Sequence, residues 1–303
     1  MKISLVGISG CGKTSIYATT FASKSPEETK SFRPTVMYEV RSHPYLGLNV
    51  SFFDFGGQDQ FRADYLAKPE IFKETDVLIP IIDLHDPDKF DIAADYFQKL
   101  KKTFDNLNIK PKILIFYHKY DAEGYQKELL ETNLQKAKEI FPKIFKEWNP
   151  EERMTSIYDQ EKLSIVFRDL LVANYKDLQS HVEHAEKQLS EINAKIIISD
   201  INGNVIVHNV PGISAGLQLR ADLRDFISSC NTMRENFFNA DSVYFKGESK
   251  EVDKEIEIYI FKYILSVLLM RPKDLDKKSK ENIKTLLIDM ELFADLVVRA
   301  LQE

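Results

Sequence analysis

The chain has 303 residues, of which 44% are hydrophobic and 29% charged, which is typical of a globular protein with one large or two ordinary domains. Its formal net charge is -6, with acidic and basic residues interspersed, and this balance argues against a nucleic-acid partner. Two cysteines, Cys11 and Cys230, are too few for a disulfide framework and favour a reducing, cytoplasmic environment. No segment has the pattern of a signal peptide, a membrane span or a lipidation site, so we expect no direct membrane insertion.

The first predicted element is a short buried strand that leads into GISGCGKTS at residues 7–15, hereafter the phosphate loop. Residues 7–14 match G-x-x-x-x-G-K-[ST], and the following KTSIYATTF favours a helix, the context that this pattern requires. Glycines let successive backbone N–H groups turn toward phosphate oxygens, and the helix adds its positive end. We expect Lys13 to reach the outer phosphates and the Thr14 hydroxyl to bind Mg²⁺. The other residues expected at the phosphates are Ser9, Gly10, Cys11, Gly12 and Ser15. We interpret Cys11 as a small loop residue rather than a reactive thiol.

Two further segments suit the metal and the outermost phosphate. The polar, proline-bearing stretch FRPTVMYEV contains Thr35, placed to close on Mg²⁺ and the γ-phosphate and to let go after hydrolysis. The stretch SFFDFGGQD is an apolar strand that ends in Asp54 and is followed by glycines. An aspartate there can bind Mg²⁺ through water, a backbone N–H at Gly57 can meet the γ-phosphate, and Gln58 can orient the attacking water.

A second pair of segments points to the base. ILIFYHKYD is a buried strand that ends in His118, Lys119 and Asp121. The Asp121 carboxylate can accept two hydrogen bonds from the N1–H and exocyclic amine of guanine, a pair that adenine does not offer, and the Lys119 stem can pack over the base. In TSIYD, the backbone N–H of Ile157 is expected to meet the guanine O6, with Ser156 bracing the loop.

The strands of the first half alternate with helices, which predicts a doubly wound, mostly parallel α/β sheet with its ligand at the carboxyl ends of the strands. The predicted strands are Lys2–Val6, Met37–Ser42, Asn49–Asp54, Asp76–Asp83, Lys112–Tyr117 and Arg153–Ser156. Each motif lies at such an end, which is an independent check on the assignment.

Taken in order, GISGCGKTS, Thr35, DFGGQ, HKYD and TSIYD resemble the Ras-like small GTPases over about residues 1–175. The details SGCGKTS, GGQD, the histidine before Lys-Tyr-Asp, and TSIYD are most similar to the Rag/Gtr branch. The resemblance implies a P-loop NTPase fold, GTP or GDP as ligand, and Thr14 and Thr35 as direct Mg²⁺ ligands with Asp54 behind them. Two departures stand out: Ser9 occupies a position that is often glycine, and His118 replaces an asparagine that helps to bind the base. An arginine finger in cis is conceivable at Arg33, although a solvated loop residue is the preferred interpretation, and we therefore expect slow hydrolysis without an activating partner.

The second half has a different pattern. A long helix is predicted from Glu161 to Asn193, then a hairpin around Asn202-Gly203, a helix with apolar residues from 219 to 237, and strands. A last helix is predicted from about Lys280, with apolar residues from Ile283 to Leu301 on one face. The stretch EIEIYIFKYILSVLLM is interpreted as strand, with partly buried helix as the alternative. This order predicts an α+β domain and resembles the roadblock/longin-type domain of Rag/Gtr proteins. The predicted division is residues 1–176 and 177–303.

The resemblance implies a molecular switch that dimerises through residues 177–303, with a second Rag/Gtr-like chain or with itself, and that signals nutrient or amino-acid supply. The implied partners are activating and exchange proteins and a scaffold with roadblock-type domains, which would supply any membrane contact. A nucleotide-bound scaffold with negligible turnover is the alternative, which Ser9 and the missing finger allow. A P-loop ATPase or small-molecule kinase is disfavoured by Asp121 and by the lack of an arginine-rich lid.

Overall fold

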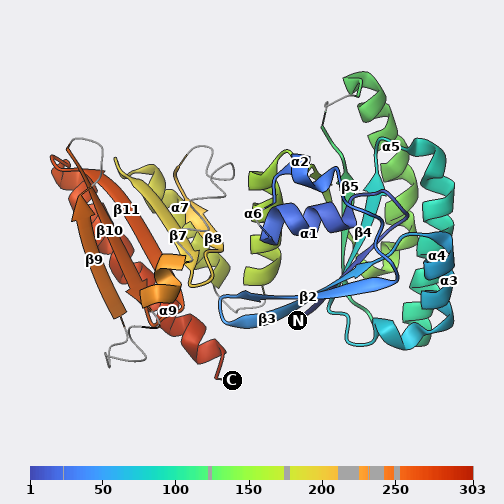
Figure 1. The fold of residues 1–303 in the computed structure, drawn as a ribbon, viewed down its shortest axis with the longest axis horizontal. Coiled ribbons are helices and arrows are strands. Elements are labelled where there is room, and N and C mark those ends of the chain that lie inside the picture. Colours follow the sequence, from blue (N-terminus) through green and yellow to red (C-terminus); the bar gives the residue numbers. More distant parts are fainter. Residues whose placement is uncertain are drawn as a thin grey trace. The chain divides into compact units, whose positions relative to one another are not determined.

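The computed structural model describes residues 1–22, 24–121, 125–173, 178–210, 225–230, 232, 242–248 and 253–302. The chain forms two compact units (Figure 1): the first contains residues 1–43 and 49–163, and the second contains residues 44–48 and 164–303. The predicted division between residues 176 and 177 lies outside the described residues.

A six-stranded sheet forms the centre of the first unit. Its strands, in the spatial order β2-β3-β1-β4-β5-β6, are β1 (Lys2–Val6), β2 (Tyr38–Tyr45), β3 (Leu48–Phe55), β4 (Val77–Asp83), β5 (Lys112–His118) and β6 (Glu151–Thr155). The pairs β1–β3, β1–β4, β4–β5 and β5–β6 are parallel, with Ile3 facing Phe52 on one side and Val77 on the other. Every residue of β4 is buried, because parallel strands covered on both faces need continuous apolar runs. The predicted doubly wound, mostly parallel sheet is confirmed.

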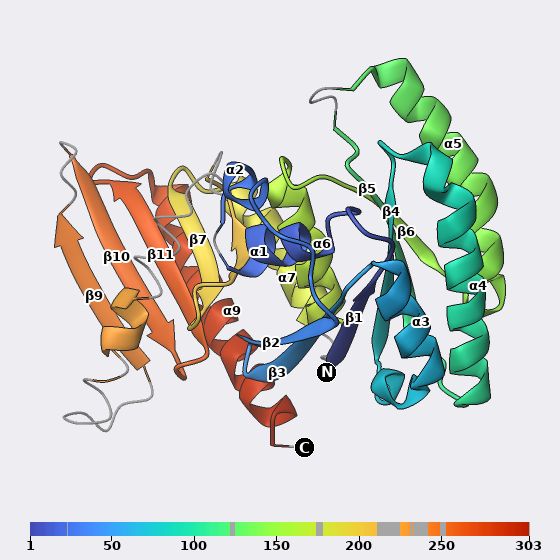
Figure 2. The ribbon, with the colours of Figure 1, turned by 45° about the vertical axis from the view of Figure 1, so that its right-hand side comes forward.

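Helices cover both faces of this sheet. They are α1 (Lys13–Phe21), α2 (Pro26–Thr29), α3 (Asp59–Ala67), α4 (Phe90–Asn106) and α5 (Lys127–Ile144), with 3-10 turns η1 (Pro69–Phe72), η2 (Pro87–Lys89) and η3 (Lys146–Trp148). Helix α6 (Gln160–Val172) begins in the first unit and continues in the second. Helices α3, α4 and α5 lie along one face and α1 along the other (Figures 1 and 2). On the α4 face, Phe104 packs edge-on to Trp148 and against Phe72, with ring centroids 6.0 and 5.3 Å apart. This packing holds the strands rigidly, so that their carboxyl ends form a fixed platform.

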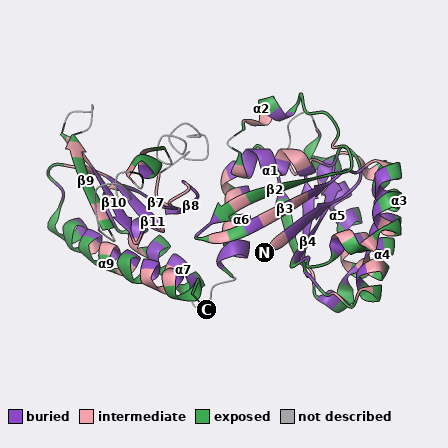
Figure 3. Cartoon of the chain, turned by 60° about the horizontal axis from the view of Figure 1, so that its bottom comes forward, coloured by how far each residue is buried: buried purple, intermediate pink, exposed green. Residues whose placement is uncertain are grey.

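An antiparallel sheet forms the centre of the second unit. Its strands, in the spatial order β8-β7-β11-β10-β9, are β7 (Lys195–Asp200), β8 (Val205–His208), β9 (Ser242–Glu248), β10 (Lys254–Phe261) and β11 (Leu265–Pro272). Helices α7 (Leu178–Ser190) and α9 (Lys277–Ala300) contact each other, and Figure 3 shows each with one buried and one exposed side. A helical segment at residues 225–230 contributes Ile227 to an apolar cluster with Ile197, Ile258 and Leu268 of the sheet. The described elements match the predicted α+β class.

The predicted hairpin is present, and a second one was not predicted. β7 and β8 pair around Gly203, whose φ of 77° lies in the left-handed region that glycine tolerates. The stretch EIEIYIFKYILSVLLM forms β10 and β11 and contains no helix, so the strand interpretation is confirmed. Its turn places Lys262 and Tyr263 at positive φ, although neither is a typical turn residue, which explains why the sequence carried no turn signal.

Two predictions about helices are wrong. The single helix from Glu161 to Asn193 is described as two, because α6 ends at Val172 with Ala173 in a turn and α7 ends at Ser190. Apolar spacing continues through both helices, so periodicity alone could not reveal the end of the first. The apolar stripe of α7 is nevertheless buried as predicted. Leu301 was expected on the buried face of the last helix, but it follows α9 and is 39% exposed. Most of the predicted helix from 219 to 237 lies outside the described residues.

Candidate nucleotide-binding site

The phosphate loop has the backbone shape that its glycines predicted. Gly10 and Gly12 have φ angles of 85° and 91°, which place both in the left-handed region and curl the chain between β1 and α1. The Lys13 ammonium is buried and donates to the carbonyl oxygens of Gly7 and Ile8 at 3.0 and 2.9 Å. The loop therefore holds a cation across its concave side, where an anionic ligand would meet it. Burial raises the pKa of the Cys11 thiol, which agrees with a packed loop residue rather than a reactive thiolate.

Side chains from three elements meet around the Asp54 carboxylate. Its Oδ2 accepts hydrogen bonds from the hydroxyls of Thr14 at 2.6 Å and Thr35 at 3.4 Å, and these hydroxyls lie 2.9 Å apart. Among the described residues, Oδ1 of this carboxylate is buried without a hydrogen-bond partner. Two hydroxyls and a carboxylate are the hard oxygen donors that Mg²⁺ prefers, and an orphaned buried oxygen is what a hydrated cation would satisfy. The predicted residues thus fit a Mg²⁺ ion, which would neutralise phosphate charge there.

The two glycines after Asp54 are in close contact with other loops. A Cβ on Gly57 would lie 2.3–2.5 Å from backbone atoms of Ile8 and Ser9, and one on Gly56 would lie 2.5–2.6 Å from carbonyl oxygens of Met37 and Thr35. Only glycine fits at either position, so the pair does more than make a turn. Gln58 follows at the N-cap of α3 and is half-buried.

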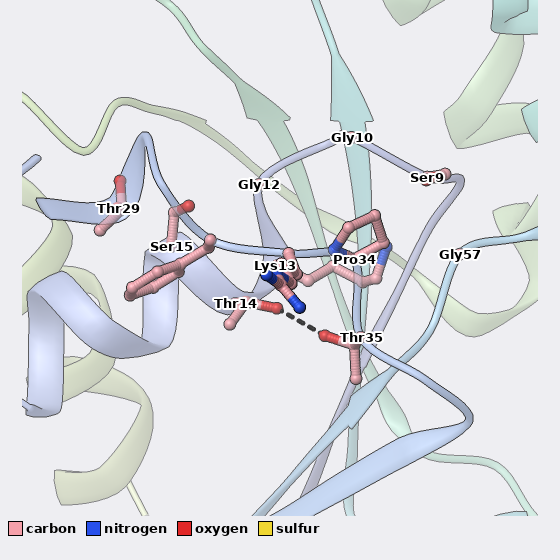
Figure 4. Close-up of a pocket in the computed structure, with 12 residues that line it drawn as sticks. Ser9, Gly10, Gly12, Lys13, Thr14, Ser15, Thr29, Pro34, Thr35 and Gly57 are labelled. Atoms are coloured by element: carbon pink, nitrogen blue, oxygen red, sulfur yellow. Dashed lines mark hydrogen bonds between the residues drawn. The ribbon is translucent and has the colours of Figure 1, made fainter. Parts of the chain in front are cut away.

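A cavity of about 230 Å³ lies between these elements (Figure 4). The described residues that line it are Ser9, Gly10, Gly12, Lys13, Thr14, Ser15, Thr29, Phe32, Arg33, Pro34, Thr35 and Gly57. The structure therefore brings the phosphate loop, Thr35 and Gly57 to one cavity, as their motifs predicted. Arg33 is exposed at the rim, and Gln58 is not among the described lining residues.

The predicted base-binding residues lie together at the ends of β5 and β6. The Ser156 hydroxyl donates to Oδ2 of Asp121 at 2.6 Å and accepts from the backbone N–H of Tyr158 at 3.0 Å. Ser156 therefore fixes both the carboxylate and the loop that carries Ile157. Lys119 has a φ of 61°, and its ammonium donates to Asp83 at the end of β4 at 2.6 Å. That ion pair holds the Lys119 stem in place beside the carboxylate.

His118 joins the two halves of the site. Its ring is 1% exposed, its Nδ1 lies 2.9 Å from the Thr155 hydroxyl, and a Cβ on Gly12 would lie 2.7–2.8 Å from its Cδ2 and Nε2. Burial lowers the pKa of His118 to about 3, so the imidazole is neutral at physiological pH. The histidine thus packs a neutral ring against the phosphate loop instead of presenting a charge to the nucleotide.

Sequence reasoning missed three residues of this site. Asp83 and Thr155 lie at the ends of predicted strands, but their roles as partners of Lys119 and His118 depend on strand order. Arg41, on β2, donates to Asp54 at 3.2 Å, and no motif marks it. Its position six residues after Thr35, in a strand next to β3, is the only sequence signal that could have found it.

These features define the class of P-loop nucleotide-binding proteins. They are a parallel sheet with a glycine loop after its first strand, a lysine across that loop, and hydroxyls beside an aspartate at the end of a strand. The sequence profile of the Gtr1/RagA G protein conserved region matches residues 2–214. The chain belongs to this family of small G proteins, as its motifs indicated.

Individual relatives are distant but cover much of the chain. GTP-binding protein gtr1 of Schizosaccharomyces pombe is 26% identical over 261 residues, which is 78% of this chain and 79% of the relative. GTP-binding protein GTR1 of Saccharomyces cerevisiae is 27% identical over 207 residues, 65% of this chain and 64% of the relative. Ras-related GTP-binding protein A of Dictyostelium discoideum is 24% identical over 253 residues, 78% and 80% of the two chains. Among solved structures, the Arl6 BBS3 small GTPase of Trypanosoma brucei with bound GppNp is 18% identical and covers 54% of this chain and 90% of its own, with a TM-score of 0.40.

Proposed function

We propose that this chain binds GTP and GDP with Mg²⁺ and acts as a molecular switch. The observation that carries the proposal is the pairing of a phosphate cavity, with Lys13 and Thr14, and a guanine-type carboxylate, Asp121, fixed by Ser156. The two places are joined through His118, which packs against Gly12. Three relatives with 24–27% identity are named as GTP-binding proteins, which supports the same ligand.

The Asp121→Asn variant tests the base assignment. An amide in place of the carboxylate loses the acceptor pair for guanine but can donate to the C2 carbonyl of xanthine. We expect guanine nucleotide affinity to fall about 100-fold or more, since a buried donor is left unpaired, and xanthine nucleotide affinity to rise. Ion-exchange analysis of nucleotide retained by the purified protein measures the first effect, and competition with XDP measures the second. Retention of adenine nucleotide by the unmodified chain would refute the assignment.

We further propose that hydrolysis is slow until a partner supplies a missing group. Gln58 follows Gly57, which suits it to orient water after a small movement, and Arg33, although it lines the cavity, is exposed to solvent. The placement of Gln58 outside the described cavity lining keeps a nucleotide-bound scaffold as a second candidate. A single-turnover assay of the unmodified chain and Gln58→Leu separates the two. A slower variant supports the GTPase, whereas equal rates favour the scaffold.

Residues 177–303 are proposed to dimerise, with a second related chain or with themselves. Helix α9 is apolar beyond its buried face, because Ile288 and Leu292 are 60% and 53% exposed, and Tyr244 on β9 is 53% exposed at the edge of the sheet. Ile288→Glu should weaken a dimer seen by light scattering. Ile92→Glu, which changes a similarly exposed isoleucine on α4 of the first unit, should not.

We further propose that the chain signals nutrient or amino-acid supply. Its partners in this role would be activating and exchange proteins and a roadblock-type scaffold, and this part of the proposal rests on the family alone. No helix among the described residues is long and apolar enough to cross a membrane. Apolar side chains around Thr35 are exposed and suit a surface that partners recognise: Phe32, Val36, Met37, Tyr38 and Val40. In cells that depend on this chain, Gln58→Leu and Thr14→Asn should shift the response to amino-acid withdrawal in opposite directions.

A further inference from the structure

Arg41 makes three contacts, and together they hold its guanidinium beside the carboxylate of Asp54. Its Nη1 donates to Oδ2 of Asp54 at 3.2 Å, and its Nη2 donates to the carboxylate of Glu39. Its guanidinium carbon lies 4.8 Å from the ring centroid of Tyr17 on α1, within the range of a cation–π contact. The side chain is 24% exposed, so these contacts, rather than solvent, set its position.

The partner of this cation is deeply buried. Asp54 is 1% exposed, and Arg41 provides its only ion pair within the described part of the chain. The ammonium of Lys13 is directed to the carbonyl oxygens of Gly7 and Ile8 instead. A buried carboxylate without a positive partner destabilises the fold, because its charge loses the solvation that water supplies. Arg41 therefore offsets the charge of Asp54 in the chain that holds no metal.

The same carboxylate fits Mg²⁺ through its hydroxyl neighbours and its orphaned Oδ1. Two cations compete for one carboxylate, so each weakens the hold of the other. We propose that Arg41 is a tethered counter-ion of Asp54, which stabilises the metal-free site and lowers the affinity of the site for Mg²⁺. The inference rests on the proposed nucleotide function, and it makes Arg41 a positioning residue that sets how readily Mg²⁺ leaves.

The surroundings of Arg41 allow it to leave the carboxylate. A cavity of about 470 Å³ lies against it, lined by Tyr17 and Ala18 of α1, by Glu39, and by the segment 32–36 that carries Thr35. This space lies on the side of the guanidinium where Tyr17 and Glu39 contact it, so it offers room for a turn away from Asp54. The counter-ion can thus be displaced when Mg²⁺ binds, without rearrangement of the sheet.

The first test is the stability of the metal-free chain in EDTA. Arg41→Gln should lower the urea midpoint, since it leaves Asp54 buried without its cation. Arg153→Gln, which removes an exposed arginine paired with Glu151 on β6, should leave the midpoint unchanged. Excess Mg²⁺ and GDP should bring Arg41→Gln closer to the unmodified chain, since the metal takes the place of the lost charge. An equal loss of stability with and without Mg²⁺ would overturn the proposal.

The second test measures how much Mg²⁺ the chain needs to retain its nucleotide. Release of a fluorescent GDP is followed as Mg²⁺ is lowered, and the Mg²⁺ concentration for half-maximal retention is recorded. Arg41→Gln should lower this concentration by roughly tenfold, the change expected for one charge-assisted hydrogen bond. Arg41→Lys keeps the charge, so its Mg²⁺ concentration should lie between those of the unmodified chain and Arg41→Gln. Tyr17→Leu keeps the arginine but removes the ring that supports it, so it should also lower the Mg²⁺ concentration. An unchanged or higher value in Arg41→Gln, or equal values for the Gln and Lys variants, would overturn the proposal.

The two tests fail in different ways. If the unmodified chain retains no GDP at any Mg²⁺ concentration, the proposed function fails, and the EDTA comparison still decides whether Arg41 neutralises Asp54. If the chain retains GDP in a Mg²⁺-dependent manner but the variants match it, the function stands and the role of Arg41 is refuted.

Discussion

At the scale of single residues, Gly57 and His118 hold the phosphate loop from two sides. Gly57 approaches the backbone of Ile8 and Ser9 so closely that a side chain cannot fit, and the His118 ring fills the space beside Gly12. The loop is therefore shaped by its neighbours as well as by its own glycines. Both contacts join residues more than 40 positions apart, so neither follows from the loop motif itself.

Gly57→Ala should reduce the free energy of unfolding by about 1–3 kcal/mol, the range for overpacking a close-packed site. The new methyl group would meet backbone atoms that cannot turn aside. Gly10→Ala is the comparison: its Cβ would meet nothing within 4 Å, and only its positive φ opposes the change, at about 1 kcal/mol. Urea unfolding of the nucleotide-free chain measures both. A larger loss in Gly10→Ala would contradict the packing argument.

Neutral His118 should make the chain less stable in mild acid. Its pKa is about 3 when folded, against about 6.5 when unfolded, so the unfolded state binds more protons between those values. Stability is then lost as pH falls below about 6.5, by roughly 1–2 kcal/mol between pH 7 and pH 5. Urea unfolding at both values should show a smaller drop in His118→Asn. The same drop in both chains would assign the effect to other groups.

At the scale of elements, the turn between β7 and β8 depends on one buried carboxylate. Asp200 is fully buried, and its Oδ1 accepts from the backbone N–H groups of Asn202 and Asn204 at 2.8 and 2.9 Å. The Asn204 side chain donates to its Oδ2 at 2.7 Å. The Asn202-Gly203 signal predicted a hairpin, but the carboxylate that holds its loop could be recognised only once the burial of Asp200 was known.

Asp200→Ala should destabilise the second unit by about 2–4 kcal/mol, since several buried donors lose their acceptor together. Asp274→Ala, at an exposed position of the same unit, should change stability by less than about 0.5 kcal/mol. Thermal unfolding followed by circular dichroism compares the two. Similar melting curves for both variants would show that the turn does not depend on Asp200.

At the scale of the whole molecule, the two units have separate cores and separate sheets. The proposed nucleotide site is built from the first unit alone, because the described residues that line its cavity belong to that unit, as do His118, Asp121 and Ser156. A ligand that binds only the folded first unit should stabilise that unit by mass action, while the second unit gains nothing from the site itself.

Calorimetry should therefore show two unfolding transitions. Mg²⁺ with GDP should raise the midpoint temperature of one, the transition of the first unit. At a free nucleotide concentration 100 times Kd, the gain is about 2.7 kcal/mol for the first unit. Asp121→Asn should abolish the shift with GDP while leaving both transitions in place. A single transition that shifts as a whole would instead mean that the units unfold together.

The sequence by itself determined the family, the parallel sheet of the first half and the identity of most cavity residues. It could do so because phosphate loops and strand-end carboxylates are local patterns, in which neighbouring residues fix both backbone shape and chemistry. The end of α6 could not be predicted, since apolar periodicity does not mark where a helix stops. The β10–β11 turn could not be predicted either, because Lys262 and Tyr263 are not typical turn residues. Only the tertiary structure decided that Arg41 pairs with Asp54, that His118 packs on Gly12 and that Ser156 holds Asp121. These contacts depend on strand order and burial, which bring distant residues together and set the energetic cost of leaving a charge or a polar group alone.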